Sequence, residues 1–283
     1  MRYVEAYGVI TMVILGMAGC ATLEEYTGLS LGGGVGGGGL ITNLNLVSTE
    51  QEIQLGQQFS SEIEKDAVLL ANPALQQYVA DIGRRLSSMA PRQDVPYGFK
   101  VIDASDTVNA FALPGGYMYI YTGLMKLCSN EAELAAVMAH EIAHVSARHH
   151  GEMMTRQTGM ELITQIALGE NPGAAASLAK QLFTVGVSAR FSRKQENEAD
   201  TVGMDILYRA GYPPDAMIAF MNKLLDMDKK QGGGRSLPLF ATHPAPEDRV
   251  ALLQNLVQQY PIEECRNRSY EENRYFEQVL AYF

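Results

Sequence analysis

The sequence predicts a mainly helical α+β domain in which a small β-sheet packs on one central helix. Three observations lead to this prediction. Apolar residues recur at helical spacing through most of the chain after Thr49, two short stretches alternate like strands, and the segment from Ala139 to Val145 carries two histidines four residues apart within a strongly helical run. The chain has 283 residues, of which 47% are hydrophobic, so it can bury a large core.

The first residues resemble a secretion signal. The apolar segment 8–19 is short for a membrane span and ends, after small residues, at Cys20. Because this arrangement resembles a bacterial lipoprotein signal, we expect residues 1–19 to be removed and Cys20 to carry a lipid; an uncleaved anchor or a buried helix is the alternative. Residues 20–48 are glycine-rich and are expected to form a flexible linker. With Ala21 after the cysteine, this predicts a protein on the periplasmic side of a bacterial cell envelope, anchored at the outer membrane.

The elements after the linker are assigned from the period of the apolar residues and from the positions of proline and glycine. Residues 49–260 are expected to form the domain, and residues 261–283 a helical tail. Lys180, Gln181 and Gly186 are expected to break one helix, and no stretch of eighteen uncharged apolar residues indicates a membrane span. The expected elements are helices over 49–70, 73–89, 160–168, 174–187, 214–229 and 246–258, strands over 97–103 and 117–122, and a turn at 114–116 that joins residues 109–113 to the second strand.

The central helix carries half of a zinc site. Ser129 and Asn130 can cap it, and His140 and His144 lie one turn apart on one face, so that two imidazole nitrogens can converge on one metal ion. Glu141 lies between them on the adjoining face, where a carboxylate can take a proton from a water held at the metal. The protein has only five histidines, and four of them fall between residues 140 and 150, which favours a metal site over a chance match.

A hydrolytic zinc site needs a third protein ligand from elsewhere. His150 lies ten residues after His140, as the third histidine of a metzincin does, but Ala147 stands where that motif needs a glycine. If the helix continues, His150 lies about 15 Å along the axis from His140 and cannot reach the same ion. We therefore interpret His149 and His150 as a solvated helix end, with a metzincin-type site as the weaker alternative.

A second helix supplies better candidates. Ser192 and Gln195 have the spacing of a capping box at its start. Glu196 and Asp200 are four residues apart and share a face, whereas Glu198 is turned roughly 200° away from Glu196. One carboxylate can therefore bind zinc while the other holds a ligand histidine. The alternative interpretation is a charged, solvent-facing first turn.

These motifs together resemble a known family. His-Glu-Ile-Ala-His at 140–144, followed by Ser-Arg-x-x-Glu-x-x-Ala-Asp at 192–200, is similar to the gluzincin family of zinc metallopeptidases that includes HtpX, the CAAX prenyl proteases and BepA. The segments 109–117 and 242–249 also fit, so the resemblance covers about residues 50–260 in the right order. No tetratricopeptide repeat pattern follows.

The resemblance implies a zincin-like metallopeptidase domain that binds one Zn²⁺ and cleaves peptide bonds. Its implied substrates are unfolded or misassembled envelope proteins, and the edge of the sheet is expected to pair with an extended substrate peptide. The implied zinc ligands are His140, His144 and Glu196. The implied catalytic residues are Glu141, which activates the water, Asp200, which orients a histidine, and His243 and Arg249, which assist the oxyanion or regulate access.

Other possibilities stay open at this point. A rival hypothesis is a zinc-stabilised chaperone or assembly factor whose peptidase site is silenced by His243 as a fourth ligand, since structural zinc sites are closed. Residues 151–190 form either a lid over the cleft or plain core, and Cys128 and Cys265 either form a disulfide or remain thiols. The net charge of −10 argues against nucleic acid as a partner.

Overall fold

The fold is built around α5 (Glu131–Ser146), the helix that carries the two spaced histidines. Residues Asn45–Phe283 form one compact unit. The computed structural model describes residues 45–184, 191–230, 232, 238–243 and 246–283. The expected signal peptide, Cys20 and all but the last residues of the expected linker lie outside the described residues.

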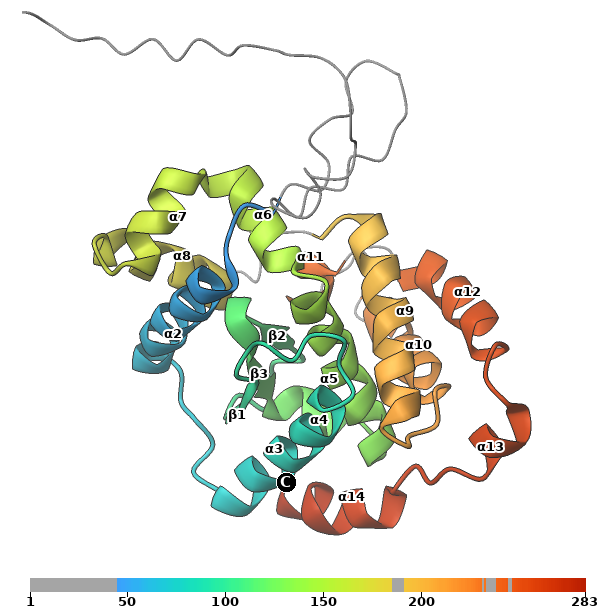
Figure 1. The fold of residues 1–283 in the computed structure, drawn as a ribbon. Coiled ribbons are helices and arrows are strands. Elements are labelled where there is room, and N and C mark those ends of the chain that lie inside the picture. Colours follow the sequence, from blue (N-terminus) through green and yellow to red (C-terminus); the bar gives the residue numbers. More distant parts are fainter. Residues whose placement is uncertain (1–44, 185–190, 231, 233–237, 244–245) are drawn as a thin grey trace, which may run out of the picture. The chain divides into compact units, whose positions relative to one another are not determined.

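The described elements follow the expected order, with small shifts at their ends (Figure 1). Before α5 the chain forms α2 (Thr49–Asp66), α3 (Pro73–Ser87), β1 (Gly98–Ile102), β2 (Ala110–Ala112), the 3-10 helix η1 (Pro114–Gly116), β3 (Tyr117–Tyr121) and α4 (Thr122–Leu127). After α5 it forms α6 (His149–Thr158), α7 (Met160–Ala167), α8 (Pro172–Thr184), α9 (Arg193–Arg209), α10 (Ala216–Lys230), α11 (Pro238–Thr242), α12 (Pro246–Val257), α13 (Ile262–Arg266), α14 (Glu272–Gln278) and the 3-10 helix η2 (Leu280–Tyr282).

The sheet has three strands in the order β1-β3-β2, with β1 parallel and β2 antiparallel to β3. The tight turn η1 between β2 and β3 needs glycine. Gly115 has a φ of 74°, and a Cβ there would lie 2.7 Å from the Cα of Ile53 on α2. The turn therefore brings the sheet directly against α2.

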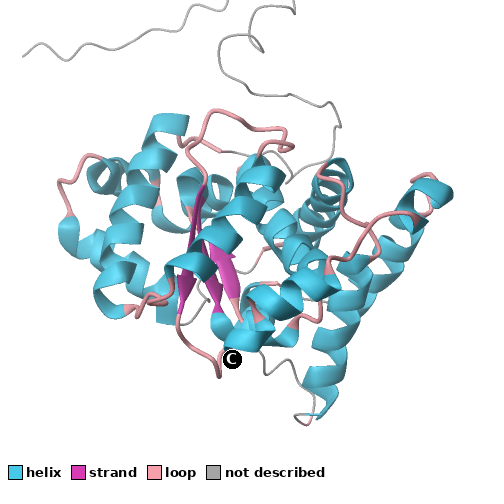
Figure 2. Cartoon of the chain, turned by 90° about the horizontal axis from the view of Figure 1, so that it is seen from below, coloured by secondary structure: helices cyan, strands magenta, loops and turns pink. Residues whose placement is uncertain are grey.

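Side chains alternate between two cores along β3, as the period of a strand requires. Met118 and Ile120 belong to the core that contains α3 and α5, whereas Tyr119 and Tyr121 belong to the core formed with α2 and α7. Helices therefore cover both faces of the sheet (Figure 2). This confirms the predicted mainly helical α+β fold with a small sheet packed on the central helix.

Helices α6, α7 and α8 pack into the second of these cores. Ile163 and Ile166 of α7 are fully buried in the same cluster as Phe59 of α2. The expected break at Lys180 and Gln181 is wrong, because α8 runs through both residues; the expected break at Gly186 lies outside the described residues. Within the described part of the chain, every helix is too short or too polar to cross a bilayer.

The C-terminal tail is tied to the start of α5. Glu131 is fully buried and accepts hydrogen bonds from the hydroxyls of Tyr78 (2.5 Å) and Tyr212 (2.6 Å), and Arg274 lies 3.3 Å from it. The possible disulfide is absent, because Cys128 and Cys265 are both free, and Cys128 is buried. Packing and buried hydrogen bonds therefore fix the N-terminal end of the metal helix.

Candidate metal centre and active site

Helix α5 presents its two histidines from a buried position. Asn130 caps the helix as predicted, because its side chain accepts a hydrogen bond from the backbone N–H of Glu133 at 2.9 Å. His140 is 7% exposed and His144 is fully buried, and their Nε2 atoms lie 3.1 Å apart. The spacing of four residues therefore brings both imidazoles to one point, as the sequence predicted.

Helix α9 lies against α5 and brings a carboxylate to the same point. Its predicted capping box is present, with the Ser192 and Gln195 side chains bonded to each other's backbone N–H groups. At Gly203 the two helices approach so closely that a Cβ would lie 3.1 Å from the Cα of His140. This close crossing places Glu196 Oε1 at 3.6 Å from His144 Nε2.

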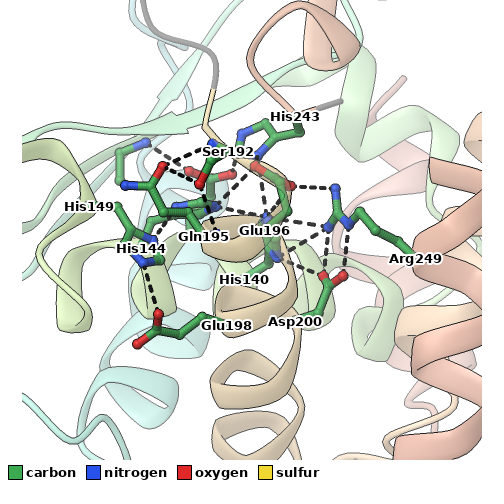
Figure 3. Close-up of polar contacts among 12 residues, drawn as sticks. His140, His144, His149, Ser192, Gln195, Glu196, Glu198, Asp200, His243 and Arg249 are labelled. Carbon is green, nitrogen blue, oxygen red and sulfur yellow. Dashed lines mark hydrogen bonds and ion pairs between the residues drawn. The ribbon is translucent and has the colours of Figure 1, made fainter. Parts of the chain in front are cut away.

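His243 completes a cluster of four metal-binding side chains. It follows the short helix α11, and its Nδ1 lies 2.9 Å from Glu196 Oε1 and 3.3 Å from His140 Nε2. Figure 3 shows the rings of His243 and His140 converging on Glu196. Within the described residues, the potential ligand atoms of the four side chains lie within 4.8 Å of one another; the four are His140, His144, Glu196 and His243.

The donor set and its spacing fit a small divalent cation. Zinc–nitrogen and zinc–oxygen bonds are about 2.0–2.2 Å long, so neighbouring ligand atoms of a tetrahedral site lie roughly 3.3–3.6 Å apart. Four of the six separations among the donor atoms lie between 2.9 and 3.6 Å, near that value, and all six are within 4.8 Å. Three imidazoles and one carboxylate are also ligands that zinc prefers. The residues therefore fit a divalent metal.

Asp200 and Arg249 support the cluster from behind. Asp200 Oδ1 lies 3.0 Å from His140 Nδ1, the ring nitrogen that faces away from the cluster. Arg249 donates to both oxygens of Asp200, at 2.6 and 2.7 Å, and its Nη1 lies 2.6 Å from Glu196 Oε2. Arg249 is only 5% exposed, so its charge neutralises two buried carboxylates.

Glu141 lies at the meeting point of the helix and the sheet. Its Oε2 accepts a hydrogen bond from the backbone N–H of Ala112 at 3.1 Å, and its Oε1 lies 3.3 Å from His243 Nε2. Ala112 ends β2, which forms one edge of the sheet, whereas Leu69 bridges the outer side of β1. The β2 edge therefore lies directly beside the candidate general base.

The charges of the site stabilise one another in the absence of metal. Burial disfavours a charged His243, but Glu196 and Glu141 outweigh it and raise the pKa of His243 to about 10. Burial likewise opposes ionisation of Glu196, yet His243 and Arg249 hold the pKa of this carboxyl well below its usual range. His144 is different, because burial lowers its pKa well below the usual value and keeps the imidazole neutral. A neutral imidazole is the form that binds a metal.

The interpretation of His149 and His150 as a solvated helix end is wrong. Helix α5 ends at Ser146, and Arg148 takes a left-handed conformation with a φ of 59°, so that α6 starts in a new direction at His149. His149 is 2% exposed and His150 is 5% exposed. His150 nevertheless stays outside the four-residue cluster, so the geometry does not support the metzincin-type alternative.

Two contacts of His144 were not predicted from the sequence. Phe191 stacks on the ring of His144, with centroids 3.9 Å apart and an interplanar angle of 28°. His149 Nδ1 lies 2.9 Å from His144 Nδ1. The contact of Phe191 has a signal in the sequence, because an apolar residue directly before an N-cap such as Ser192 often packs at the start of the helix. His149 gives no such signal, because the turn at Arg148 uses a residue other than glycine.

A small apolar cavity adjoins the cluster. Its volume is about 40 Å³, enough for a few water molecules. The site side chains on its wall are His140, Glu141, Asp200, His243 and Arg249. The apolar wall comes from α5, α10 and α11 and comprises Ala136, Val137, Met217, Phe220, Met221, Leu224, Leu239 and Phe240.

Comparison with known proteins identifies the family. The profile described as "Peptidase family M48" matches residues 73–257, which include both metal helices and α12. The chain belongs to peptidase family M48. The resemblance inferred from the two motifs is thereby confirmed, and the family and the cluster together support a divalent metal.

Several curated relatives carry names that describe proteases. The beta-barrel assembly-enhancing protease of Escherichia coli (strain K12) is 35% identical over 222 residues, which are 75% of this chain and 45% of that protein. The mitochondrial metalloendopeptidase OMA1 of Schizosaccharomyces pombe is 28% identical over 81% of this chain and 67% of its own length. The metalloprotease LoiP of E. coli is 31% identical over 72% of this chain and 79% of its own length. The chain thus spans about half the length of the first of these M48 relatives.

Proposed function

We propose that this M48 protein is a zinc-dependent endopeptidase whose zinc is held by His140, His144 and Glu196. One observation carries the proposal. The donor atoms of these three side chains converge beside the buried carboxylate of Glu141, which a backbone N–H of the sheet edge orients. Two neutral imidazoles and one carboxylate form a ligand set that favours zinc and leaves a fourth position for chemistry.

The roles of the surrounding side chains follow from their contacts. Bound zinc supplies a Lewis acid that polarises the scissile carbonyl and makes water a stronger nucleophile at neutral pH. Glu141 accepts the proton of the attacking water and then gives it to the nitrogen of the leaving amine. The hydrogen bond from Ala112 holds this carboxylate in place between the sheet edge and the metal ligands.

Asp200 and Arg249 act as positioning residues in this proposal. Asp200 accepts from His140 Nδ1 and thereby keeps His140 Nε2 free to bind the metal. We expected Arg249 to clamp a carboxylate or a carbonyl, and its guanidinium is engaged by the carboxylates of Asp200 and Glu196. Its contribution is therefore to hold two buried carboxylates in their ionised form.

His243 is proposed to latch the site at rest. Its Nδ1 occupies the fourth place of the cluster, and Leu239 and Phe240 beside it are buried. A catalytic zinc site keeps an open position, so His243 must leave before substrate enters. After it leaves, its ring can donate a proton or a hydrogen bond to the oxyanion that forms on the scissile carbonyl.

The proposed substrates are unfolded or misassembled proteins of the bacterial cell envelope. Two observations support this class. The relative at 35% identity is named a beta-barrel assembly-enhancing protease, and the sequence before the domain resembles a lipoprotein signal with Cys20 as its lipidation site. The edge of β2 can pair with any extended backbone, so cleavage depends on local unfolding more than on sequence. We propose a lipid-anchored protein on the periplasmic side of the outer membrane.

The decisive test is Glu141→Gln. The amide keeps the shape of the side chain but cannot accept the proton, so the variant should bind zinc as the wild type does and lose cleavage of a casein-type substrate. Cleavage by Glu141→Gln at a rate comparable to that of the wild type would contradict the proposed mechanism. Zinc content of both proteins, measured on the same samples, separates a lost base from a lost metal.

The four-donor geometry also favours a second candidate, a zinc-stabilised chaperone or assembly factor. A permanently bound His243 would give the closed site that is typical of structural zinc. Metal content and cleavage of the wild type, Glu196→Ala and His243→Ala discriminate the two functions. The peptidase hypothesis expects Glu196→Ala to lose zinc and His243→Ala to keep zinc with raised or altered cleavage. If all three proteins have the same zinc content and none cleaves the substrate, the result supports the zinc-stabilised chaperone or assembly factor instead.

A further inference from the structure

The two metal-binding histidines of α5 have different partners on their outer nitrogens. His140 uses Asp200, at 3.0 Å from its Nδ1, which is the common arrangement of a metal-binding histidine and a carboxylate. Among the described residues no carboxylate contacts Nδ1 of His144, which lies 2.9 Å from Nδ1 of His149. His149 Nε2 in turn faces Glu198 Oε2 at 3.6 Å, and the Glu198 side chain is half exposed (Figure 3).

We propose that His149 and Glu198 form a two-residue relay that orients the metal ligand His144. The relay does for His144 what Asp200 does for His140, but through an intervening imidazole. This inference rests on the proposed metal site and adds a positioning role for two residues outside the four-residue cluster. The helical wheel turns Glu198 away from Glu196. The relay would connect Glu198 to the metal ligand His144 through the ring of His149.

The proton positions follow from the two distances and from ligation. A neutral imidazole that binds metal through Nε2 carries its proton on Nδ1, so His144 donates from Nδ1 and His149 accepts on its own Nδ1. His149 must then carry its proton on Nε2, which is the nitrogen that faces the carboxylate of Glu198. Each ring nitrogen of the relay thus has a single role, and the carboxylate of Glu198 favours the tautomer of His149 that carries its proton on Nε2.

The fold holds the relay in place from several sides. The left-handed Arg148 turns the chain so that His149 faces back toward α5, and the Nε of Arg148 lies 3.2 Å from the buried carboxylate of Glu52. The side chain of Gln195 donates to Glu152 at 2.8 Å and so ties α9 to α6. These contacts bring His149 and Glu198 together from two helices, and they hold His149 almost without exposure to solvent.

A direct role for His149 as a metal ligand disagrees with the geometry. The cluster uses Nε2 of His144, whereas His149 contacts the opposite nitrogen of that ring. The relay accounts for both contacts.

Zinc affinity, measured by competition with a chromophoric chelator, tests the relay without any assay of cleavage. His149→Leu removes the acceptor and keeps much of the volume, and it should weaken zinc binding about 10- to 100-fold. His149→Gln keeps an acceptor oxygen and a donor N–H, so it should recover much of the loss. Glu198→Ala should weaken binding by a smaller factor in the wild type and have no further effect in the His149→Leu background.

Two controls make the result decisive. His150→Leu removes a neighbouring imidazole of similar burial that makes no hydrogen bond to a cluster ligand among the described contacts, and its zinc affinity should stay near that of the wild type. Unfolding midpoints of the metal-free proteins show that the variants fold. With Co²⁺ in place of zinc, the visible spectrum of His149→Leu should shift, because the orientation of His144 changes.

The outcomes separate this inference from the proposed function. The relay is overturned if His149→Leu binds zinc with wild-type affinity. It is also overturned if His149→Leu and His149→Gln lose the same zinc affinity and the loss from Glu198→Ala adds fully to that from His149→Leu. Either result leaves the peptidase proposal standing. A wild-type protein that binds no zinc overturns both. The relay is supported if His149→Leu binds zinc much more weakly than His149→Gln and if Glu198→Ala causes no further loss of zinc affinity in the His149→Leu background.

Discussion

Replacement of Arg249 tests whether the candidate site is held together by one buried cation. Arg249→Met keeps a long apolar stem and removes the guanidinium, which lies 2.6 Å from Glu196 and 2.6 and 2.7 Å from the two oxygens of Asp200. Both carboxylates are fully buried. The substitution therefore leaves two buried negative charges with only the site histidines as partners.

The expected loss is large in the metal-free protein. Removal of one partner from a buried ion pair destabilises a protein by about 3–5 kcal/mol, and Arg249 is paired with two carboxylates. Bound zinc takes over the charge of Glu196, so the loss in the zinc-loaded protein should be smaller by about 1.5–3 kcal/mol, the contribution of one charged hydrogen bond. Zinc should therefore stabilise Arg249→Met more than it stabilises the wild type.

Urea unfolding of the metal-free and the zinc-loaded forms measures these differences, with circular dichroism and tyrosine fluorescence as two probes of the same transition. Arg266→Met is the matched control, because Arg266 lies 3.1 Å from Glu263 on an exposed helix and should change stability little. A loss below about 1 kcal/mol for metal-free Arg249→Met would refute the assignment of Arg249 as the cation that neutralises the site.

Two further predictions concern helix packing and pH. Gly203→Ala should destabilise the protein by about 1–3 kcal/mol and weaken zinc binding, because its Cβ would lie 3.1 Å from the backbone of His140. Gly173→Ala is the control, because a Cβ there meets nothing within 4 Å. Equal effects of the two substitutions would disprove the close crossing of α5 and α9. The pKa of His243 is about 10 in the folded state and about 6.5 in the unfolded state, so the charged ring stabilises the fold below this window. The metal-free protein should therefore lose stability as the pH rises from about 6.5 to about 10. A pH titration of stability checks this, and the same slope in His243→Gln would contradict it.

Local rules in the sequence predicted the parts of the site that one helix determines. The spacing of His140 and His144 and the capping box at Ser192 depend on residues within four positions of each other, and the structure contains both. The position of His149 depends on a reversal at Arg148, which takes a left-handed conformation although it is not glycine. Contacts with Glu52, almost a hundred residues earlier, fix that turn, and no local pattern records such a contact.

The same limit left the partner of Arg249 open. From the sequence, an arginine six residues after His243 can bind any carboxylate or carbonyl. The packing of α12 against α9 decides the matter by bringing Arg249 to Glu196 and Asp200, which are themselves four residues apart on one face. The helical wheel of α9 predicted that both carboxylates share a face, but it could not show that a cation from a third helix fills the space between them.

His243 links the stability of the metal-free site to the activity of the loaded one. Without metal, its charged ring lies between Glu196 (2.9 Å) and Glu141 (3.3 Å) and offsets their repulsion. In the proposed latched state, the same ring must be neutral to serve as the fourth zinc ligand, and there it would exclude substrate. His243→Ala should therefore have opposite effects on two measurements: lower stability of the metal-free protein, and faster cleavage of an unfolded substrate by the zinc-loaded protein. If stability falls and cleavage falls with it while zinc is retained, His243 is needed for the chemistry itself and is not mainly a latch.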